Sequence, residues 1–250
     1  MADWSVALLL GTALLLGLQH GVDWDHLAAI SDITSTMPET RRGLLLGTLY
    51  VLGHAAVVVT IGLLAIWAGL ELPEWVDSMM EPFVGATLVF LGLYIIYSLA
   101  RDREHFHMRS RWMLLFDGLR TLWDWAGGRL RGRPQPAQPR RPTTYGMRTA
   151  VGVGMIHGVG AETPSQVLLF LAAAGAGGHV LGSAVLLVFV LGLVLANWAI
   201  TVGSLFGYAR ARRHRRLYVG AGVLTAVLSM AIGLLFLTGQ GALLPPIVGG

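Results

Sequence analysis

Long apolar runs are the feature that most constrains this chain of 250 residues. A helix of roughly 20 apolar residues is long enough to cross a bilayer, and several runs reach about that length. Only 13% of the residues are charged, whereas about 25% are charged in soluble domains. We therefore predict an all-α integral membrane protein.

Hydropathy predicts about six transmembrane helices. Their approximate limits are Trp4–Ile30, Gly43–Leu70, Phe83–Ala100, Thr149–Ala174, Val180–Ala209 and Leu217–Thr238. The first run has no basic residues ahead of it and no small-residue cleavage site after it, so we expect a mature span rather than a signal peptide.

Arginine alternates between the predicted loops. The loops after spans one, three and five are arginine-rich, and the other two carry none. The positive-inside rule then predicts a multi-pass protein of the cell membrane with both termini outside. This topology also accounts for the basic pI of about 10.0, so no nucleic-acid partner is expected. Within the cytoplasmic loop 101–148, residues 111–130 are suited to an amphipathic helix at the interface.

Two residue types are absent from the chain. Without cysteine, neither a disulfide nor a thiolate metal site can form. All 18 basic residues are arginine, so a Walker-type phosphate loop and a Schiff-base lysine are excluded. These absences argue against ATP-driven pumping by this chain alone and against retinal photochemistry.

The sequence contains an internal repeat. "GLQHGV" at 17–22 returns as "GMIHGV" at 154–159, an offset of 137 residues, and each copy has a carboxylate five residues after its histidine. "VLGH" at 51–54 matches "VLGL" at 190–193, and "VGA" at 84–86 matches "VGA" at 219–221. Three spans per half predict a 3+3 inverted repeat, with residues 1–100 and 149–250 as its halves, an architecture typical of secondary transporters.

Ionisable residues within spans are candidate functional residues, because they are costly to bury. At 1.5 Å per residue, histidines of the first, second and fourth spans lie about 10–16 Å from the predicted cytoplasmic edge. Imidazole and carboxylate ligands suit nickel, cobalt or zinc, and carboxylates compensate the charge of the ion. We predict a site for a transported ion, without a resident cofactor, formed by His20, Asp23, Asp25, His26, His54, His157 and Glu162.

The spacing raises a geometric question about the carboxylates. On a regular helix Asp25 lies about 140° from His20, and Glu162 lies about 140° from His157. Either these carboxylates face another helix or the backbone unwinds. Glycines and a proline in "HGVGAETPSQ" favour unwinding in the fourth span, whereas the first span offers only Gly21.

The pattern H-x4-D-H followed by L-A-A-I, here "HGVDWDHLAAI", resembles the signature of the nickel/cobalt transporter family. "LGHAAVV" at 52–58 is similar to that family's second motif, and "GMIHGVGAETPSQ" occupies the place of a third. The resemblance implies permeation of Ni²⁺ or Co²⁺, with His20, Asp25 and His26 as signature positions. The chain departs from the family in Gln19, in Trp24, in its third motif and in its number of spans.

Structural roles are the alternative for each candidate. The first cluster could be a polar knot at a helix end, and His54 could be hydrogen-bonded between helices. His157 and Glu162 could form a hydrogen bond between spans, and Asn197 is more easily explained by such a bond than by ligation.

We therefore expect a secondary transporter, not an enzyme, that takes up a divalent transition metal, with Ni²⁺ favoured over Co²⁺. Efflux of the same ions is one alternative, because nothing in the sequence determines direction. A membrane-embedded assembly factor or metalloenzyme that retains its metal is another. The sequence does not indicate an oligomeric state.

Overall fold

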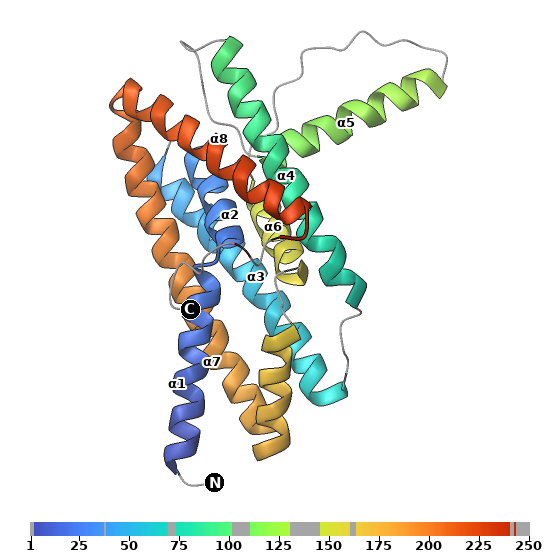
Figure 1. The fold of residues 1–250 in the computed structure, drawn as a ribbon, viewed down its shortest axis with the longest axis vertical. Coiled ribbons are helices and arrows are strands. Elements are labelled where there is room, and N and C mark those ends of the chain that lie inside the picture. Colours follow the sequence, from blue (N-terminus) through green and yellow to red (C-terminus); the bar gives the residue numbers. More distant parts are fainter. Residues whose placement is uncertain are drawn as a thin grey trace.

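The computed structural model describes residues 3–37, 39–69, 74–101, 111–130, 146–160, 164–240 and 243. This part of the chain is almost wholly helical (Figure 1). The helices are α1 (Asp3–Gly21), α2 (Trp24–Ser35), α3 (Thr40–Ala68), α4 (Glu74–Arg101), α5 (Arg111–Leu130), α6 (Met147–Gly160), α7 (Pro164–Arg212) and α8 (Arg215–Leu237). The predicted all-α membrane protein is confirmed.

Three helical segments are long and apolar enough to cross a membrane, namely Thr40–Ala68, Gly177–Ala211 and Arg216–Leu237. The bent pair α1 and α2 makes a fourth if it counts as one span, and Pro82–Tyr97 is a shorter apolar helix. The predicted count of six spans remains a prediction. The third predicted span is part of a longer helix, because α4 already begins at Glu74 and contains Pro82.

Two helices end in the middle of the bundle. α1 stops at Gly21 and α2 starts at Trp24, with a bend of 53° between them. Asp23, in this break, has an extended backbone with φ −61° and ψ 158°. α6 stops at Gly160 and α7 starts at Pro164. The unwinding predicted for the fourth span thus has a counterpart in the first span, where the sequence argued for it less strongly.

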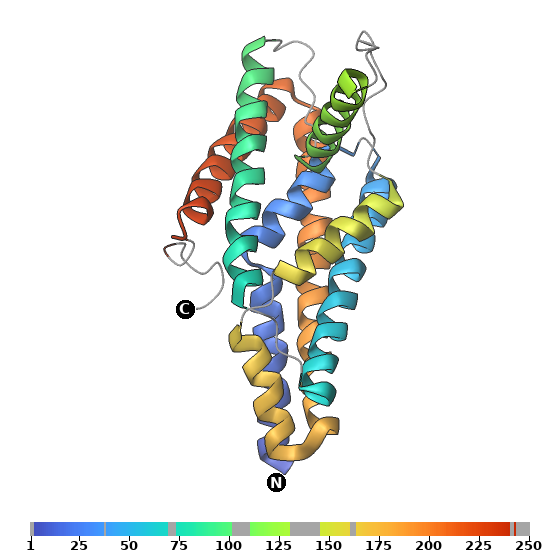
Figure 2. The same ribbon diagram turned by 90° about the vertical axis from the view of Figure 1, so that its right-hand side faces the viewer.

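α7 contains a third interruption, at Gly178. Its φ of 79° and ψ of 171° are not helical, and a positive φ is costly for residues other than glycine. This interruption falls between the predicted fourth and fifth spans. Figure 2 shows the sharp turn that the chain makes there, at one end of the bundle.

Four helix pairs make up the bundle: α1 with α7, α3 with α6, α3 with α7, and α4 with α8. α1 runs parallel to α7, because Gly17 meets Phe189 whereas Gly21 meets Ala196. α3 runs antiparallel to α7, because Gly47 meets Thr201 whereas Gly62 meets Leu186. These directions are those expected of helices that cross the membrane alternately.

Glycines allow two of these pairs to touch through their backbones. A Cβ atom on Gly17 of α1 would overlap the carbonyl of Phe189 in α7. A Cβ atom on Gly154 of α6 would overlap the carbonyl of Tyr50 in α3. Gly154 follows Gly17 by 137 residues, the offset of the "GLQHGV" repeat. Small residues are the usual means by which helices in membranes approach closely.

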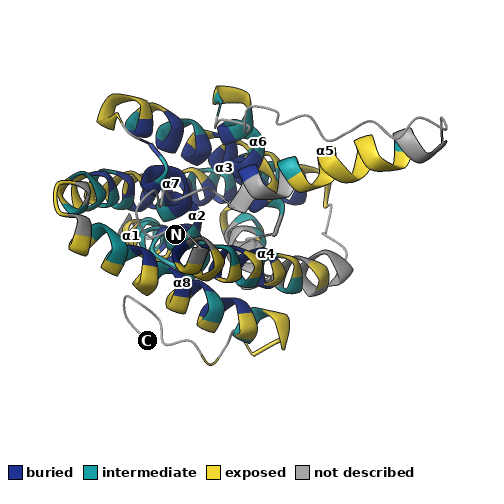
Figure 3. Ribbon diagram, turned by 90° about the horizontal axis from the view of Figure 1, so that it is seen from above, coloured by how far each residue is buried: buried dark blue, intermediate teal, exposed yellow. Residues whose placement is uncertain are grey.

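The arginine-bearing ends gather on one side of the molecule. In Figure 1 the end of α4, the turn between α7 and α8, and α5 lie at the top, and the N-terminus lies at the bottom. Large apolar side chains are exposed around the helices, as expected of a lipid-facing surface, for example Leu8, Leu93 and Val227. Viewed from above, the buried residues gather between α2, α3, α6 and α7 (Figure 3).

The glycine contact gives a test of the packing. We expect Gly154→Ala to destabilise the protein by about 1–3 kcal/mol, the usual cost of overpacking, because the methyl group would overlap the Tyr50 carbonyl. Gly152→Ala is the matched control on the same helix, since no heavy atom lies within 4 Å of its Cβ position. Thermal melting in detergent measures both variants, and equal melting temperatures would contradict the packing described.

Candidate metal site at the helix breaks

Four histidines from four helices meet beside the break between α1 and α2. His20 is in the last turn of α1, His26 in α2, His54 in the middle of α3, and His157 in the last turn of α6. His26 and His54 are 0% exposed, and the other two are 5% exposed. Imidazoles this deeply buried need partners or a ligand to offset the loss of water.

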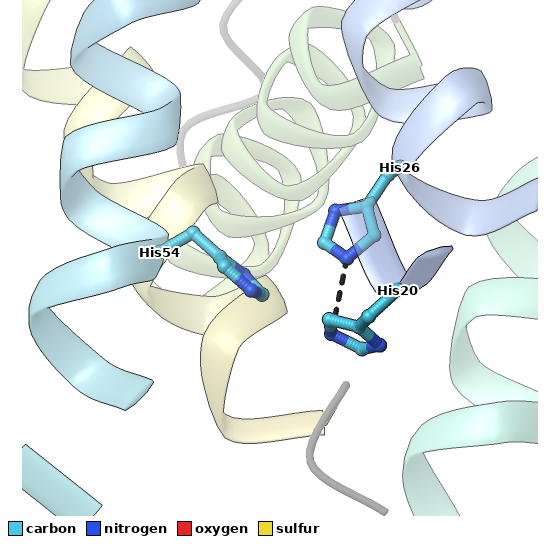
Figure 4. Close-up of side chains that lie close together, drawn as sticks. All are labelled: His20, His26 and His54. Atoms are coloured by element: carbon cyan, nitrogen blue, oxygen red, sulfur yellow. Dashed lines mark hydrogen bonds between the residues drawn. The ribbon is translucent and has the colours of Figure 1, made fainter. Parts of the chain in front are cut away.

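The ring of His26 lies at the centre of the group. Its centroid is 4.7 Å from that of His54, 4.8 Å from that of His157 and 4.9 Å from that of His20. Figure 4 shows that His20, His26 and His54 point toward one another from three helical segments. The potential ligand atoms of these three all lie within 4.8 Å of one another.

A carboxylate joins the group from the start of α2. Asp25 Oδ2 lies 3.1 Å from His157 Nε2, and Asp25 Oδ1 accepts a 2.8 Å hydrogen bond from the His26 backbone N–H. Asp25, His26 and His157 form a second set of ligand atoms within 4.8 Å. Because α2 starts in a new direction after the break, Asp25 and His26 can both face the region reached by His20.

The spacings are those of ligands that share one ion. His20 Nε2 and His26 Nε2 are 3.3 Å apart. Nitrogen and oxygen ligands lie about 2.0–2.2 Å from a divalent transition metal, so two ligands of one ion are about 3.0–3.5 Å apart at angles of 90–110°. The His20–His26 and Asp25–His157 separations both fall in this range, which fits a metal bound between them.

Two of the predicted site residues lie elsewhere. Asp23 Oδ2 is 3.4 Å from His20 Nδ1, and the Asp23 side chain is 47% exposed. It therefore belongs to neither ligand set, but it can orient His20 with Nε2 toward His26, as carboxylates commonly orient metal-binding histidines. Glu162 lies outside the described residues.

Two further residues contact the site that the sequence analysis did not identify. The Tyr50 hydroxyl lies 3.4 Å from His26 Nδ1, and the Phe189 ring lies 5.7 Å from the His20 ring. Tyr50 is 0% exposed and can hold the ring of His26 with Nε2 free for an ion. Its position four residues before His54, one helical turn away, was the signal available in the sequence.

Two buried side chains have no hydrogen-bond partner among the described residues. They are His54, through both ring nitrogens, and Asn197, through both amide atoms. Burying a polar group without a partner costs about 1–3 kcal/mol. The alternative role for His54, as a residue hydrogen-bonded between helices, therefore has no support in this part of the chain.

Comparison with known proteins supports a relationship over the first half of the chain. Residues 6–101 match the model of a family described as "High-affinity nickel-transport protein". The resemblance indicated by the motifs is thus confirmed over these residues, and the family described is one of transporters, not enzymes. No solved structure is significantly similar to the chain.

Three curated relatives match parts of the chain. A high-affinity nickel transport protein of Cupriavidus necator is 46% identical over 77 residues, which are 29% of this chain and 22% of that protein. A urease accessory protein, UreH, of a Bacillus species is 30% identical over 95 residues, 38% of this chain and 42% of that protein. A Methanocaldococcus jannaschii protein named "Putative nickel/cobalt efflux system" is 31% identical over 97 residues, 38% of this chain and 45% of that protein. Each match spans less than half of the relative.

The unpartnered imidazole of His54 gives a test of function against structure. We expect His54→Leu to leave the melting temperature of metal-free protein unchanged or raised, because no hydrogen bond to a described residue is lost. His157→Leu is the comparison, since it leaves Asp25 without its 3.1 Å contact, and it should lower the melting temperature. An equal loss in both variants would show that His54 has a structural role.

Proposed function

We propose that this chain, whose residues 6–101 match the nickel-transport family, is a secondary transporter of a divalent transition-metal cation, most readily Ni²⁺. The observation that carries the proposal is the group of four buried imidazoles and one carboxylate around His26. The ion is the transported substrate rather than a resident cofactor.

The chemistry of the ligands favours a borderline divalent ion. Imidazole suits nickel, cobalt and zinc, whereas calcium and magnesium require oxygen ligands. Asp25 supplies a negative charge that partly compensates a dication in a region of low dielectric. Ni²⁺ is placed before Co²⁺ because two of the curated relatives are named for nickel transport or for nickel/cobalt efflux.

Movement of the ion is supported by where the helices break. Ligands come from the ends of α1 and α6 and from the start of α2, next to interruptions of the helical backbone. Broken helices at the centre of the bundle are typical of transporter binding sites. A metal that never leaves its site needs no such breaks.

We propose that the two halves form a 3+3 inverted repeat around this site. Gly17 meets Phe189 and Leu193, and Gly154 meets Tyr50 and His54. Each residue of the second contact corresponds to one of the first at an offset of 137 or 139 residues. The pairs α1–α7 and α3–α6 are then equivalent, and rocking of one half against the other would expose the ion alternately to the two sides.

The two ligand sets overlap in His26. One set joins this residue to His20 and His54, and the other joins it to Asp25 and His157. An ion can therefore pass from one set to the other while it keeps its bond to His26. Ligand exchange in steps avoids a fully unligated ion, which would be prohibitively costly in a region of low dielectric.

The proposed location is the cell membrane, with the arginine-bearing ends in the cytoplasm and both termini outside. We propose uptake as the direction, because an inside-negative potential favours the entry of a dication. The curated relatives are named both for transport and for efflux, so the direction has to be measured.

Uptake of radiolabelled nickel into proteoliposomes tests the proposal. Wild-type protein should accumulate nickel when a potassium gradient with valinomycin makes the lumen negative, and less when the lumen is positive. His26→Ala removes the residue common to both ligand sets, so uptake should fall at least about tenfold. Nickel release driven by the opposite potential would favour efflux.

His179→Ala is the matched control for this experiment. His179 is exposed, and its ring stacks on that of Trp67 at 5.0 Å, so the variant should transport like wild type. Undiminished uptake by His26→Ala would refute the site. Tightly retained nickel without any flux would instead favour an assembly factor, in keeping with the relative named as a urease accessory protein.

A further inference from the structure

Asn197 of α7 is a buried amide that the packing of the bundle leaves unexplained. It is 0% exposed, and neither its oxygen nor its nitrogen has a hydrogen-bond partner among the described residues. An interhelical hydrogen bond, the role that the sequence suggested, would require such a partner. Buried polar groups without partners are rare in native proteins, and each needs a specific explanation.

The register between helices places Asn197 close to the level of the histidines. α3 and α7 are antiparallel, with Gly47 against Thr201 and Gly62 against Leu186. Asn197 is therefore level with residue 51, about one turn from His54. Side chains tilt toward the N-terminus of their own helix, so in this antiparallel pair Asn197 and His54 lean toward each other's level.

The rotation of α7 aims Asn197 at the gap between α1 and α3. Ala196 faces Gly21 of α1, and Thr201 faces Gly47 of α3. At about 100° per residue, Asn197 points between these two directions, about 100° from one and 40° from the other. His20 at the end of α1 and His54 in α3 face each other across the same gap, with ring centroids 6.2 Å apart.

We propose that Asn197 is a further ligand of the transported ion, which it binds through its amide oxygen together with His20, His26 and His54. This inference rests on the proposed function. It explains why a polar side chain without a protein partner lies beside His54, whose nitrogens also lack one. It also adds α7 to the helices that hold the ion.

An amide oxygen has the properties that such a site requires. Nickel and cobalt accept mixed nitrogen and oxygen ligands. A neutral oxygen increases the number of ligands without adding charge, so the ion is not held as tightly as a second carboxylate would hold it. Because Asn197 belongs to the second predicted repeat, a movement between the halves would add or remove this ligand.

Calorimetric titration of the purified full chain with NiCl2 in detergent tests the proposal. Asn197→Leu removes the oxygen at nearly constant volume and should weaken binding about tenfold. The melting temperature of the metal-free variant should stay unchanged or rise, because no protein hydrogen bond is lost. Asn197→Asp keeps an oxygen at the same place and should bind nickel at least as tightly as wild type.

Thr201→Val is the matched control on the same face of α7. The Thr201 side chain is buried, but its hydroxyl has a partner, the Asn197 carbonyl oxygen at 2.9 Å. This variant should melt earlier without a change in nickel affinity. Wild-type affinity in Asn197→Leu, or a loss of metal-free stability that accounts for the weaker binding, would overturn the role of Asn197. An absence of nickel binding by wild type would overturn the proposed function itself.

Discussion

Direct backbone contact between helices is the interaction on which the candidate site depends. Gly17 lets α1 lie against α7, and Gly154 lets α6 lie against α3. Any side chain at either position would separate the helices, and the imidazoles would then be too far apart to share an ion. Helices in lipid gain little from burying apolar surface against each other, so small residues and close packing take over that role.

The second condition is the interruption of α1. A continuous helix would place Asp25 about 140° from His20, on a different face. The break at residues 22–23 starts a new helix, and its first turn carries both Asp25 and His26 toward His157 and His20. The polar side chains and the broken backbone thus support each other, since non-helical backbone at membrane depth is tolerated where protein surrounds it.

Much of this arrangement could be predicted from the sequence. The apolar runs predict helices, and histidines at similar depth in three spans predict a shared layer. The contacts of Tyr50 and Asn197 could not be predicted in the same way. A tyrosine or asparagine within a span is compatible with several roles, and only the rotation and register of neighbouring helices decide which groups it meets. Glu162 lies outside the described residues, so its place in the site remains a prediction.

The sequence by itself determined the class of the protein and the chemistry of its ligands. Hydropathy and helix length follow directly from composition, and a histidine- and aspartate-rich motif defines what could be bound. The tertiary structure decided which ligands meet. His26 is central because the 53° bend turns α2, and Asp23 faces away from the ligand sets for the same reason. These outcomes depend on contacts between helices far apart in the chain, which no local pattern contains.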